Sequence, residues 1–357
     1  MIKRAVSFHG PRCPGSAAGF SGLVLALWLS TFPGLLQAQT NAGTASTNAP
    51  SQEQATLIRL GARNTQAHDP STVLKCQGEY WFFCTGVGIG SRRSKDLVHW
   101  TTGPRVFPDR PPAWHTNSVP GNRGHLWAPD VIYHRGRYLL YYSVSTFGKN
   151  TSAIGLASSV TLEPGSPDFG WTDHGPVIES RPTNDFNAID PAVFADSDGR
   201  LWLSFGSFWS GLKLIELDPN TGKRLAADSP IYPLANYRAI EAPFIHRRED
   251  RYYLFMNWDT CCRGLASTYN IRIGRSDSIL GPYVDRDGKH LLEGGGTLLL
   301  GTTGPFIGPG HASILRSNGT DLLSCHFYDG TTARGTARLA LLPIRWRDGW
   351  PEVAVPK

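Results

Sequence analysis

Apolar and aromatic residues gather in five short runs that recur along most of the chain. Each run follows a polar turn, and a few apolar residues precede that turn, which is the pattern of a β-hairpin. The turns are Gln77-Gly78, Arg135-Gly136, Asp198-Gly199, Glu249-Asp250 and Asn318-Gly319, and the runs cover residues 80–83, 138–142, 201–205, 252–255 and 322–327. Hairpins that join aromatic strands through such turns predict β-blades.

Each repeat opens on a residue that can do acid–base or ligand chemistry. These residues are Asp69, Asp130, Asp190, Glu241 and His311, and the intervals between them are 61, 60, 51 and 70 residues. A repeat of this length predicts a propeller or an array of repeats. We therefore predict an all-β, five-bladed β-propeller whose first strands line the central channel and bring the five polar residues to one mouth of it.

The composition favours strands and turns over helices, except at the N-terminus. Trp, Tyr and Phe make up 11% of the chain, with 39 Gly and 26 Pro residues. Lys3, Arg4 and Arg12 precede an apolar run over residues 20–36, and the small residue Ala38 follows this run. This order predicts a secretory signal peptide, and the alternative is an N-terminal membrane anchor.

The predicted domain organisation has three parts. Residues 1–38 form the signal peptide, residues 39–54 a low-complexity tether rich in Thr, Ala, Ser and Asn, and residues 55–357 the propeller. We expect a secreted or periplasmic monomer that does not bind a membrane after cleavage.

Charge gives little sign of a macromolecular partner. The net charge is +6, and loss of the three basic residues in the signal peptide leaves about +3. The remaining basic residues are scattered, so the sequence lacks the basic block typical of nucleic-acid or membrane-surface binding.

Five of the six cysteines lie beyond the predicted signal peptide, and two of them are adjacent. An odd number in an exported protein leaves at least one free thiol if the others pair within the chain. Cys261 and Cys262 form either a vicinal disulfide, which would stiffen a loop at the channel mouth, or two reduced thiols.

Three carboxylates in one channel indicate glycoside hydrolysis. Burial of a carboxylate is unfavourable without a partner or a function, and neighbouring carboxylates raise one another's pKa and separate into acid and base. A glycosidase needs one carboxylic acid to protonate the leaving oxygen and one carboxylate to activate water or to attack carbon. The structural alternative is that these acids bond backbone amides of neighbouring blades.

Most aromatic side chains are expected to fill the spaces between blades. The exceptions are Trp127, Phe147, Phe208, Trp209 and Trp258, which we place in loops on the face where the blades open. Flat rings beside acids suit packing against the faces of sugars.

These motifs together resemble glycoside hydrolase family 43. The resemblance rests on His68-Asp69-Pro70, Trp127-Ala128-Pro129-Asp130, Asn187-Ala188-Ile189-Asp190-Pro191, Ile240-Glu241-Ala242-Pro243 and Gly310-His311. Residues 141–155 and 204–213 and the Cys-Cys-Arg-Gly at residues 261–264 are similar to the arabinanases of that family. The resemblance implies an inverting endo-1,5-α-L-arabinanase that cleaves arabinan, on a five-bladed propeller.

The resemblance also implies roles for individual residues. Asp69 would be the general base, Glu241 the general acid, and Asp190 the residue that sets the pKa and orientation of the acid, whereas Asp130 is not one of these three groups. An inverting mechanism predicts a separation of ~6.5–9.5 Å between the carboxyl groups of Asp69 and Glu241. The expected substrate-contact residues are Asp69, Trp127, Phe147, Gly148, Asn187, Ala188, Ile189, Asp190, Ser207, Phe208 and Trp209.

His311 would hold a water-ligated metal ion, by resemblance calcium, on the channel axis. We expect no protein carboxylate close enough to chelate that ion, so its role would be electrostatic. The alternative is a histidine that is satisfied within the core.

Three other functions fit parts of the pattern. The first is an exo-acting α-L-arabinofuranosidase or β-xylosidase on the same fold, which would need one closed end of the cleft. The second is a fructan-cleaving propeller, which is disfavoured because His68 stands where that class has Asn. The third is a sugar-binding propeller without turnover, which is disfavoured because Asp69 and Glu241 are both present.

Overall fold

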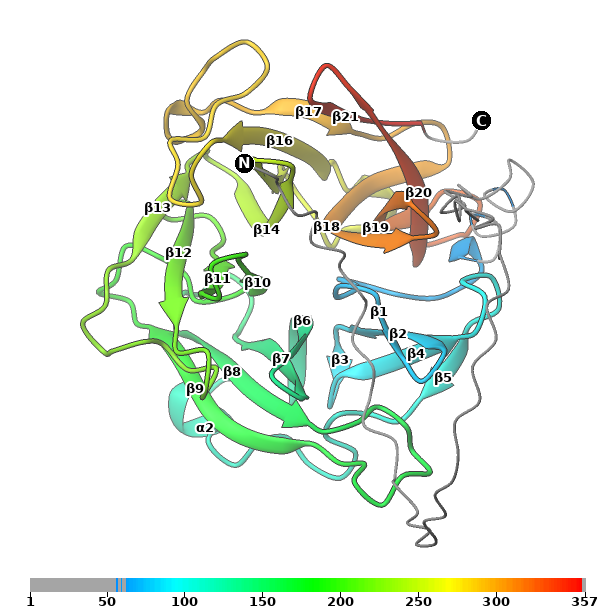
Figure 1. The fold of residues 1–357 in the computed structure, drawn as a ribbon, viewed down its shortest axis with the longest axis vertical. Coiled ribbons are helices and arrows are strands. Elements are labelled where there is room, and N and C mark those ends of the chain that lie inside the picture. The colour runs from blue at the N-terminus through cyan, green and yellow to red at the C-terminus, as the bar shows by residue number, and fades with distance from the viewer. Residues whose placement is uncertain (1–55, 57–58, 60–61, 355–357) are drawn as a thin grey trace, which may run out of the picture.

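The described chain forms five β-sheets arranged around a central axis (Figure 1). The structure is a computed structural model that describes residues 56, 59 and 62–354, so the predicted signal peptide and tether lie outside the described residues. The prediction of a five-bladed propeller is confirmed. Within the described ranges, the model contains no helix with the length and apolar character needed to cross a bilayer.

Four sheets have four strands and the second has five. Blade 1 contains β1 (Leu74–Cys76), β2 (Glu79–Cys84), β4 (Gly90–Ser94) and β5 (Thr101–Gly103). Blade 2 contains β3 (Gly86–Val87), β6 (His125–His134), β7 (Arg137–Val144), β8 (Ser152–Ser159) and β9 (Thr172–Ser180). Blade 3 contains β10 (Ala192–Ala195), β11 (Leu201–Phe205), β12 (Leu212–Leu217) and β13 (Tyr232–Ala235).

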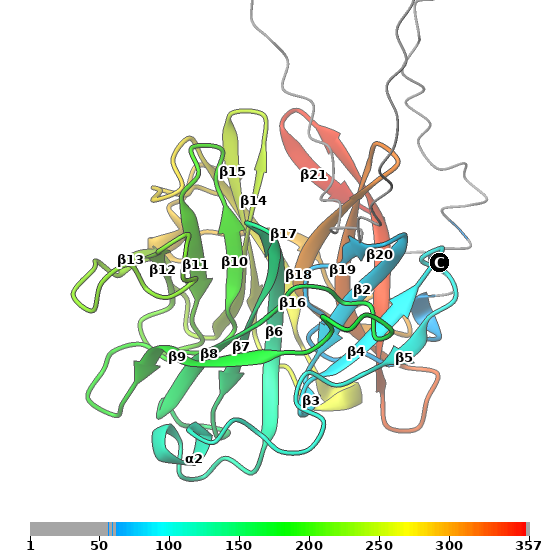
Figure 2. The same cartoon turned by 60° about the horizontal axis from the view of Figure 1, so that its bottom comes forward.

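Blade 4 contains β14 (Ile240–Arg248), β15 (Arg251–Trp258), β16 (Asn270–Ser276) and β17 (Thr297–Leu300). Blade 5 contains β18 (Phe306–Ser317), β19 (Thr320–Asp329), β20 (Thr336–Arg347) and β21 (Trp350–Val353). The short helices are α2 (His115–Ser118), η1 (Gly264–Ala266) and η2 (Leu291–Glu293), and Figure 2 shows α2 at one end of the propeller, beyond the strands.

Local turn chemistry accounts for the inner hairpins. Gln77-Gly78, Arg135-Gly136 and Asn318-Gly319 each have two consecutive residues with positive φ, between 45° and 88°. Two left-handed residues in a two-residue loop match the right-handed twist of the flanking strands. The turn at Asp198-Gly199 uses Gly199 alone, and the turn at Glu249-Asp250 uses Glu249.

The core lies between the blades, as the aromatic runs predict. Phe82, Tyr141, Phe205, Phe255 and Phe327, one from each run, are fully buried. The apolar clusters combine residues of neighbouring blades, for example Leu139 of blade 2 with Leu203 of blade 3. Burial between sheets therefore holds each blade in place against the next.

The residues that precede blade 1 pair with blade 5 and close the ring. Ala67 donates its amide to the carbonyl of Ala337 (3.3 Å), and Leu339 donates to the carbonyl of Thr65 (2.9 Å). This pairing delivers Asp69 to the centre of the propeller directly after the closure.

Candidate active site

One residue at the opening of each blade adopts the left-handed conformation. These residues are Asp69, Ala128, Asp190, Ala242 and His311, with φ between 44° and 60°, and all but His311 precede a proline. Register shifts mark β-bulges at the openings of β6, β14 and β18. Bulges re-aim side chains next to active sites, and here they turn the start of each blade towards the channel.

This shared conformation corrects the predicted equivalence of the five polar residues. Asp69, Asp190 and His311 occupy the same position in their repeats, whereas Glu241 precedes that position by one residue and Asp130 follows it by two. In four of the five repeats the Xaa-Pro step, rather than the acid, marks the equivalent position.

Asp130 is accordingly a structural residue, and the prediction that it reaches the channel mouth is wrong. Its carboxylate accepts hydrogen bonds from the amides of Thr72 in the segment leading into blade 1 and Val193 of blade 3, both at 2.9 Å. Asp130 is buried, and it does not line the cleft described below. It joins neighbouring blades, which is the alternative that the sequence left open.

A cleft of about 1150 Å³ lies where the blades open. It contains three carboxylates and His311, from four different blade openings, together with aromatic side chains from the intervening loops. The residues discussed here that line it are His68, Asp69, Trp127, Phe147, Gly148, Asn187, Ile189, Asp190, Ser207, Phe208, Trp209, Glu241, Tyr269, His311 and Tyr328.

Asp69 is held as an ionised carboxylate. One oxygen, Oδ2, accepts from Thr85 Oγ1 (2.6 Å) and lies 2.8 Å from His68 Nδ1, and the Asp69 amide donates to His326 Nδ1 (3.2 Å). Burial alone would raise the pKa of Asp69, but the charge and hydrogen bond of His68, together with His311 and His326, hold it well below its usual range. The same pairing raises the pKa of His68 despite burial.

Glu241 and Asp190 have the opposite electrostatic environment. Burial raises the pKa of Glu241, although hydrogen bonds from Ser207 and Tyr269 oppose the rise. The Ser207 hydroxyl donates to Glu241 Oε2 at 2.8 Å. The pKa of Asp190 lies well above its usual range because of burial and the charges of Glu241 and Asp69, and its Oδ2 accepts from the Ala242 amide (3.2 Å). The site thus places one ionised carboxylate opposite two that favour the protonated form.

Most predicted substrate-contact residues line the cleft. Phe147, Phe208 and Trp209 are exposed by 84%, 38% and 45%, which is unusual for large apolar side chains. Asn187 is buried in the wall of the cleft, and its Oδ1 has no hydrogen-bond partner among the described residues. That oxygen is available to a sugar hydroxyl.

One predicted contact, Ala188, and one aromatic side chain expected in a loop, Trp258, have other roles. Ala188 is fully buried, donates its amide to Ser180 Oγ (2.9 Å) and does not line the cleft. Trp258, expected in an exposed loop, is the last residue of β15, is buried and stacks on Tyr237 with ring centroids 3.8 Å apart. A single tryptophan next to a loop has the same local pattern whether it packs inward or faces the cleft.

His311 lies in the cleft, and a carboxylate lies near its ring, although we expected no protein carboxylate close enough to chelate an ion there. Its Nδ1 is 3.8 Å from Asp69 Oδ1, and its amide donates to Asn257 Oδ1 (2.9 Å). Ligand atoms of His68, Asp69 and His326 lie within 4.8 Å of one another. These groups supply few oxygens, whereas calcium prefers six to eight oxygen ligands, so the protein alone does not form a calcium cage.

The adjacent cysteines are joined. Cys261 and Cys262 form a disulfide at the edge of the cleft, while Cys76, Cys84 and Cys325 are buried and form no disulfide. Of the two states that the sequence left open, the structure has the disulfide.

Tyr269 and Tyr328 line the site but were not recognised from the sequence. Tyr269 hydrogen-bonds Glu241, and the Tyr328 hydroxyl lies 2.9 Å from His68 Nε2. Tyr328 directly follows the aromatic run at residues 322–327, so its pattern is that of a core strand residue. The alternation along β19 gave no usable signal because nearly all of that strand is buried.

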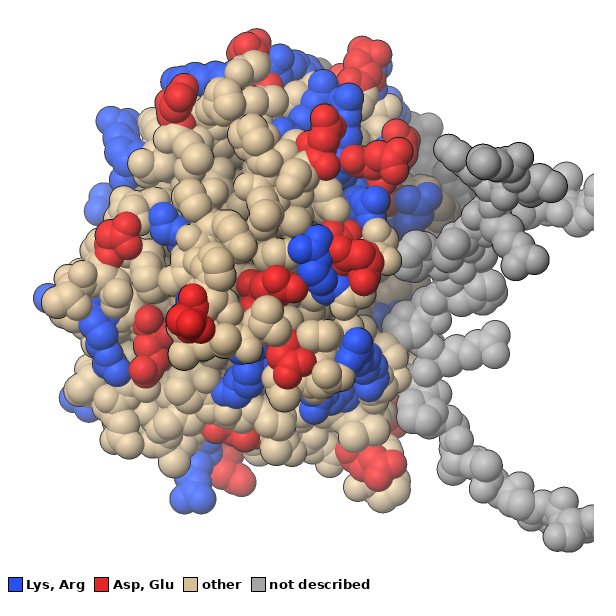
Figure 3. Space-filling model, turned by 60° about the vertical axis from the view of Figure 1, so that its left-hand side comes forward, with Lys and Arg blue, Asp and Glu red and all other residues tan. Residues whose placement is uncertain are grey.

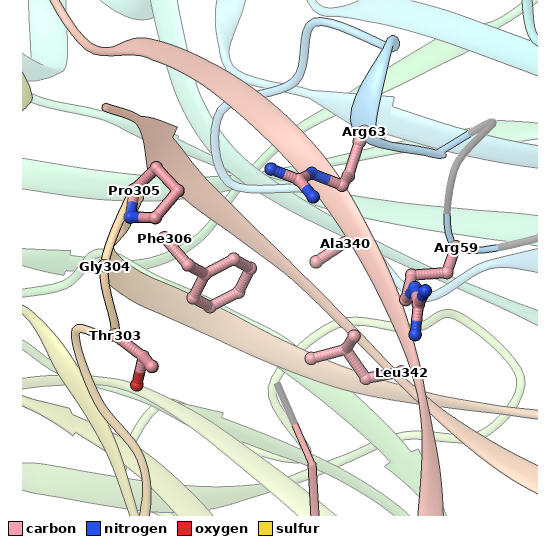
Figure 4. A pocket seen from close by; sticks show the side chains of 8 residues that line it. All are labelled: Arg59, Arg63, Thr303, Gly304, Pro305, Phe306, Ala340 and Leu342. Atoms are coloured by element: carbon pink, nitrogen blue, oxygen red, sulfur yellow. The ribbon is translucent and has the colours of Figure 1, made fainter. Parts of the chain in front are cut away.

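A second, smaller cavity of about 280 Å³ lies between the N-terminal segment and blade 5. Figure 4 shows Arg59 and Arg63 on one side of it and Phe306 on the other. It lacks a carboxylate, so it does not offer the acid and base that the cleft provides. On the face shown in Figure 3, lysine, arginine, aspartate and glutamate side chains are interspersed.

Comparisons with known proteins agree with this geometry. Residues 63–351 match the family model "Glycosyl hydrolases family 43". The extracellular exo-α-(1→5)-L-arabinofuranosidase ArbA of Cellvibrio japonicus is 43% identical over 312 residues, covering 83% of this chain and 88% of that protein. The extracellular endo-α-(1→5)-L-arabinanase 1 of Bacillus subtilis is 44% identical over 301 residues, covering 82% and 88%.

The fold comparison gives the same result. The solved structure of Cellvibrio cellulosa α-L-arabinanase complexed with arabinohexaose has a TM-score of 0.78 and 42% identity, and the match covers 81% of this chain and 95% of that one. The family match spans nearly all described residues, including the three acids of the cleft. The chain belongs to glycosyl hydrolase family 43.

Proposed function

We propose that this protein is a secreted endo-1,5-α-L-arabinanase that hydrolyses α-1,5-L-arabinofuranosidic bonds of arabinan with inversion. The observation that carries the proposal is the single cleft that combines exposed aromatic rings with Asp69, whose pKa is held low, and Glu241, whose pKa is raised by burial. Relatives with extracellular names support secretion. An oligosaccharide complex of a structural neighbour supports an oligosaccharide substrate.

In this mechanism Glu241 protonates the leaving glycosidic oxygen, because burial raises the pKa of its carboxyl group and so favours the proton-bearing form. Asp69 takes a proton from the attacking water, because the neighbouring histidines keep it ionised. The charge of Glu241 raises the pKa of Asp190, so the two groups interact, and in this mechanism Asp190 sets the pKa and orientation of the acid. The rings of Phe147, Phe208 and Trp209 would pack against arabinofuranose units on either side of the cleaved bond.

Endo action is tested by the sizes of the products over time. Incubation with linear arabinan should first give a broad range of oligosaccharides, whereas an exo enzyme would release one small product from the start. Relatives of both kinds are about equally similar to this chain, so this experiment separates the two candidates. The same samples followed by NMR should show inverted configuration at the new anomeric carbon.

Removal of the Asp190 charge should move the pH profile. The carboxyl groups of Asp190 and Glu241 interact, so the first proton that the pair loses leaves a negative charge that holds the second proton. Asp190→Asn removes that charge, which lowers the pKa of Glu241. Since activity requires protonated Glu241, the alkaline limb of kcat should shift to lower pH, with KM nearly unchanged. An alkaline limb that stays in place in pH–rate measurements would refute this role.

We also propose that His311 is the protein ligand of a calcium ion that is otherwise held by water. Water would have to supply most of the ligands of such an ion, because few protein oxygens lie near the buried His311. When bound, the ion would supply a positive charge that favours the ionised forms of nearby acids. A chelator should lower kcat and calcium should restore it. A purified protein without metal by elemental analysis, and with activity unchanged by the chelator, would remove calcium from the proposal.

A further inference from the structure

The disulfide-closed turn at Cys261–Cys262 lies between β15 and η1, at the edge of the cleft. Cys262 adopts φ +68°, a left-handed conformation that is uncommon for residues other than glycine. The turn also packs tightly on its neighbour, since a Cβ atom on Gly264 would come within 2.3 Å of the Arg334 carbonyl oxygen. The backbone at residues 261–264 is therefore held in one conformation by a covalent ring and by close packing.

A chain of hydrogen bonds connects this turn to Asp69. The Cys262 amide donates to Tyr328 Oη at 2.8 Å. Tyr328 Oη is 2.9 Å from His68 Nε2, and His68 Nδ1 is 2.8 Å from Asp69 Oδ2. Cys262 Sγ itself lies 3.9 Å from His68 Nε2.

The ring of His68 has few other restraints that set its rotation. It stacks on His326 with centroids 4.3 Å apart, which fixes its plane but not the direction of its nitrogens. Tyr328 also hydrogen-bonds Ser267, whose Oγ accepts from the Arg263 amide. Ser267 and Cys262 can both donate to Tyr328 Oη, which leaves the Tyr328 proton for His68 Nε2. His68 Nδ1 then donates to Asp69.

We propose that Tyr328 is a positioning residue that couples the Cys261–Cys262 turn to the catalytic base through His68. The proposal rests on the proposed role of Asp69 as the base. Opening the disulfide releases Cys262 from its left-handed conformation, which turns its amide away from Tyr328 and leaves His68 free to rotate. Asp69 keeps its hydrogen bond from Thr85, so it is displaced rather than released.

The test measures kcat and KM on linear arabinan for the full-length protein before and after reduction with a phosphine. Reduction should lower kcat by up to about 10²-fold, because small displacements of a catalytic group have effects of that size, and KM should change little. Tyr328→Phe should show the lowered kcat from the start and should not respond to reduction. Tyr253→Phe, which alters a hydroxyl bonded to Gly349 away from the cleft, is the matched control and should respond like wild type.

The variant Cys261→Ser/Cys262→Ser checks that the reductant acts on this pair, since the other described cysteines form no disulfide. Its kcat should equal that of reduced wild type and should not change when the reductant is added. The coupling is overturned if reduction leaves the wild-type kcat unchanged. It is also overturned if reduction lowers the kcat of Tyr328→Phe by the same factor as in wild type, because independent effects add in free energy.

A second readout does not depend on activity. Reduction should shift the ring ¹⁵N signals of His68 in labelled wild-type protein, and the shift should be clearly smaller in Tyr328→Phe, where only the direct contact with Cys262 Sγ remains. Equal shifts in the two proteins overturn the coupling. Absence of a shift in wild type overturns the coupling. If the protein fails to hydrolyse arabinan, the proposed function is wrong, and the His68 signals still decide whether the turn, Tyr328 and His68 are connected.

Discussion

Asp69→Asn should abolish hydrolysis of both arabinan and an activated aryl arabinoside. The amide keeps the shape of the side chain but cannot accept a proton from water, and water must be activated for either substrate. The expected loss in kcat is about 10²–10⁴-fold, the usual contribution of general acid–base catalysis. Initial rates on the two substrates measure it.

The control for this variant is Asp198→Asn, in an exposed turn where Asp198 pairs with Arg200 (2.7 Å), and its activity should equal that of wild type. Unfolding curves of Asp69→Asn check that the loss is chemical. If Asp69→Asn keeps its rate on the aryl substrate, Asp69 is not the base. An activated leaving group needs little protonation, but the attacking water must still be activated.

The five blades could be predicted because their signals are local. Turns such as Asn318-Gly319 specify a hairpin by their own backbone preferences, and the aromatic runs beside them are buried between sheets. The positions of Asp69, Asp190 and Glu241 in one cleft followed from the fold, since the openings of the blades meet at the axis. The roles of these acids still rest on the resemblance and on the proposed mechanism.

The register of the openings could not be read from the acids. Asp130 and Asp69 each lie next to or near a proline, yet the bulge in blade 2 places Ala128 rather than Asp130 in the left-handed position. The conformation of a bulge depends on pairing with β7, which is distant in sequence. An acid two residues beyond the bulge points between the blades, where it bonds backbone amides instead of substrate.

The network around Asp69 was hidden for a different reason. His326 and Tyr328 come from β19, whose residues are nearly all buried, so hydrophobic alternation does not distinguish core positions from the cleft. Their approach to His68 spans more than 250 residues of sequence. The sequence could not decide between a Cys261–Cys262 disulfide and two reduced thiols, because adjacent cysteines occur in both forms.

Glu241→Gln should separate the two substrates that Asp69→Asn affects alike. The amide cannot donate a proton to the leaving oxygen, so cleavage of arabinan, whose leaving group is a sugar alcohol, should fall by about 10²–10⁴-fold. An activated aryl arabinoside leaves with little protonation and should keep a large part of its rate. The rate on the aryl arabinoside divided by the rate on arabinan therefore rises in Glu241→Gln and stays constant in Asp69→Asn.

The structure also predicts the pH dependence of that difference. Burial raises the pKa of Glu241, so the wild-type alkaline limb on arabinan reports loss of its proton. In Glu241→Gln the residual hydrolysis of the aryl substrate should lack this limb, whereas Glu179→Gln, which alters a half-buried partner of Arg181 away from the cleft, should keep the wild-type profile. An alkaline limb that persists unchanged in Glu241→Gln would assign the acid to another group, and Asp190, whose pKa is also raised by burial beside Glu241, would be the next residue to test.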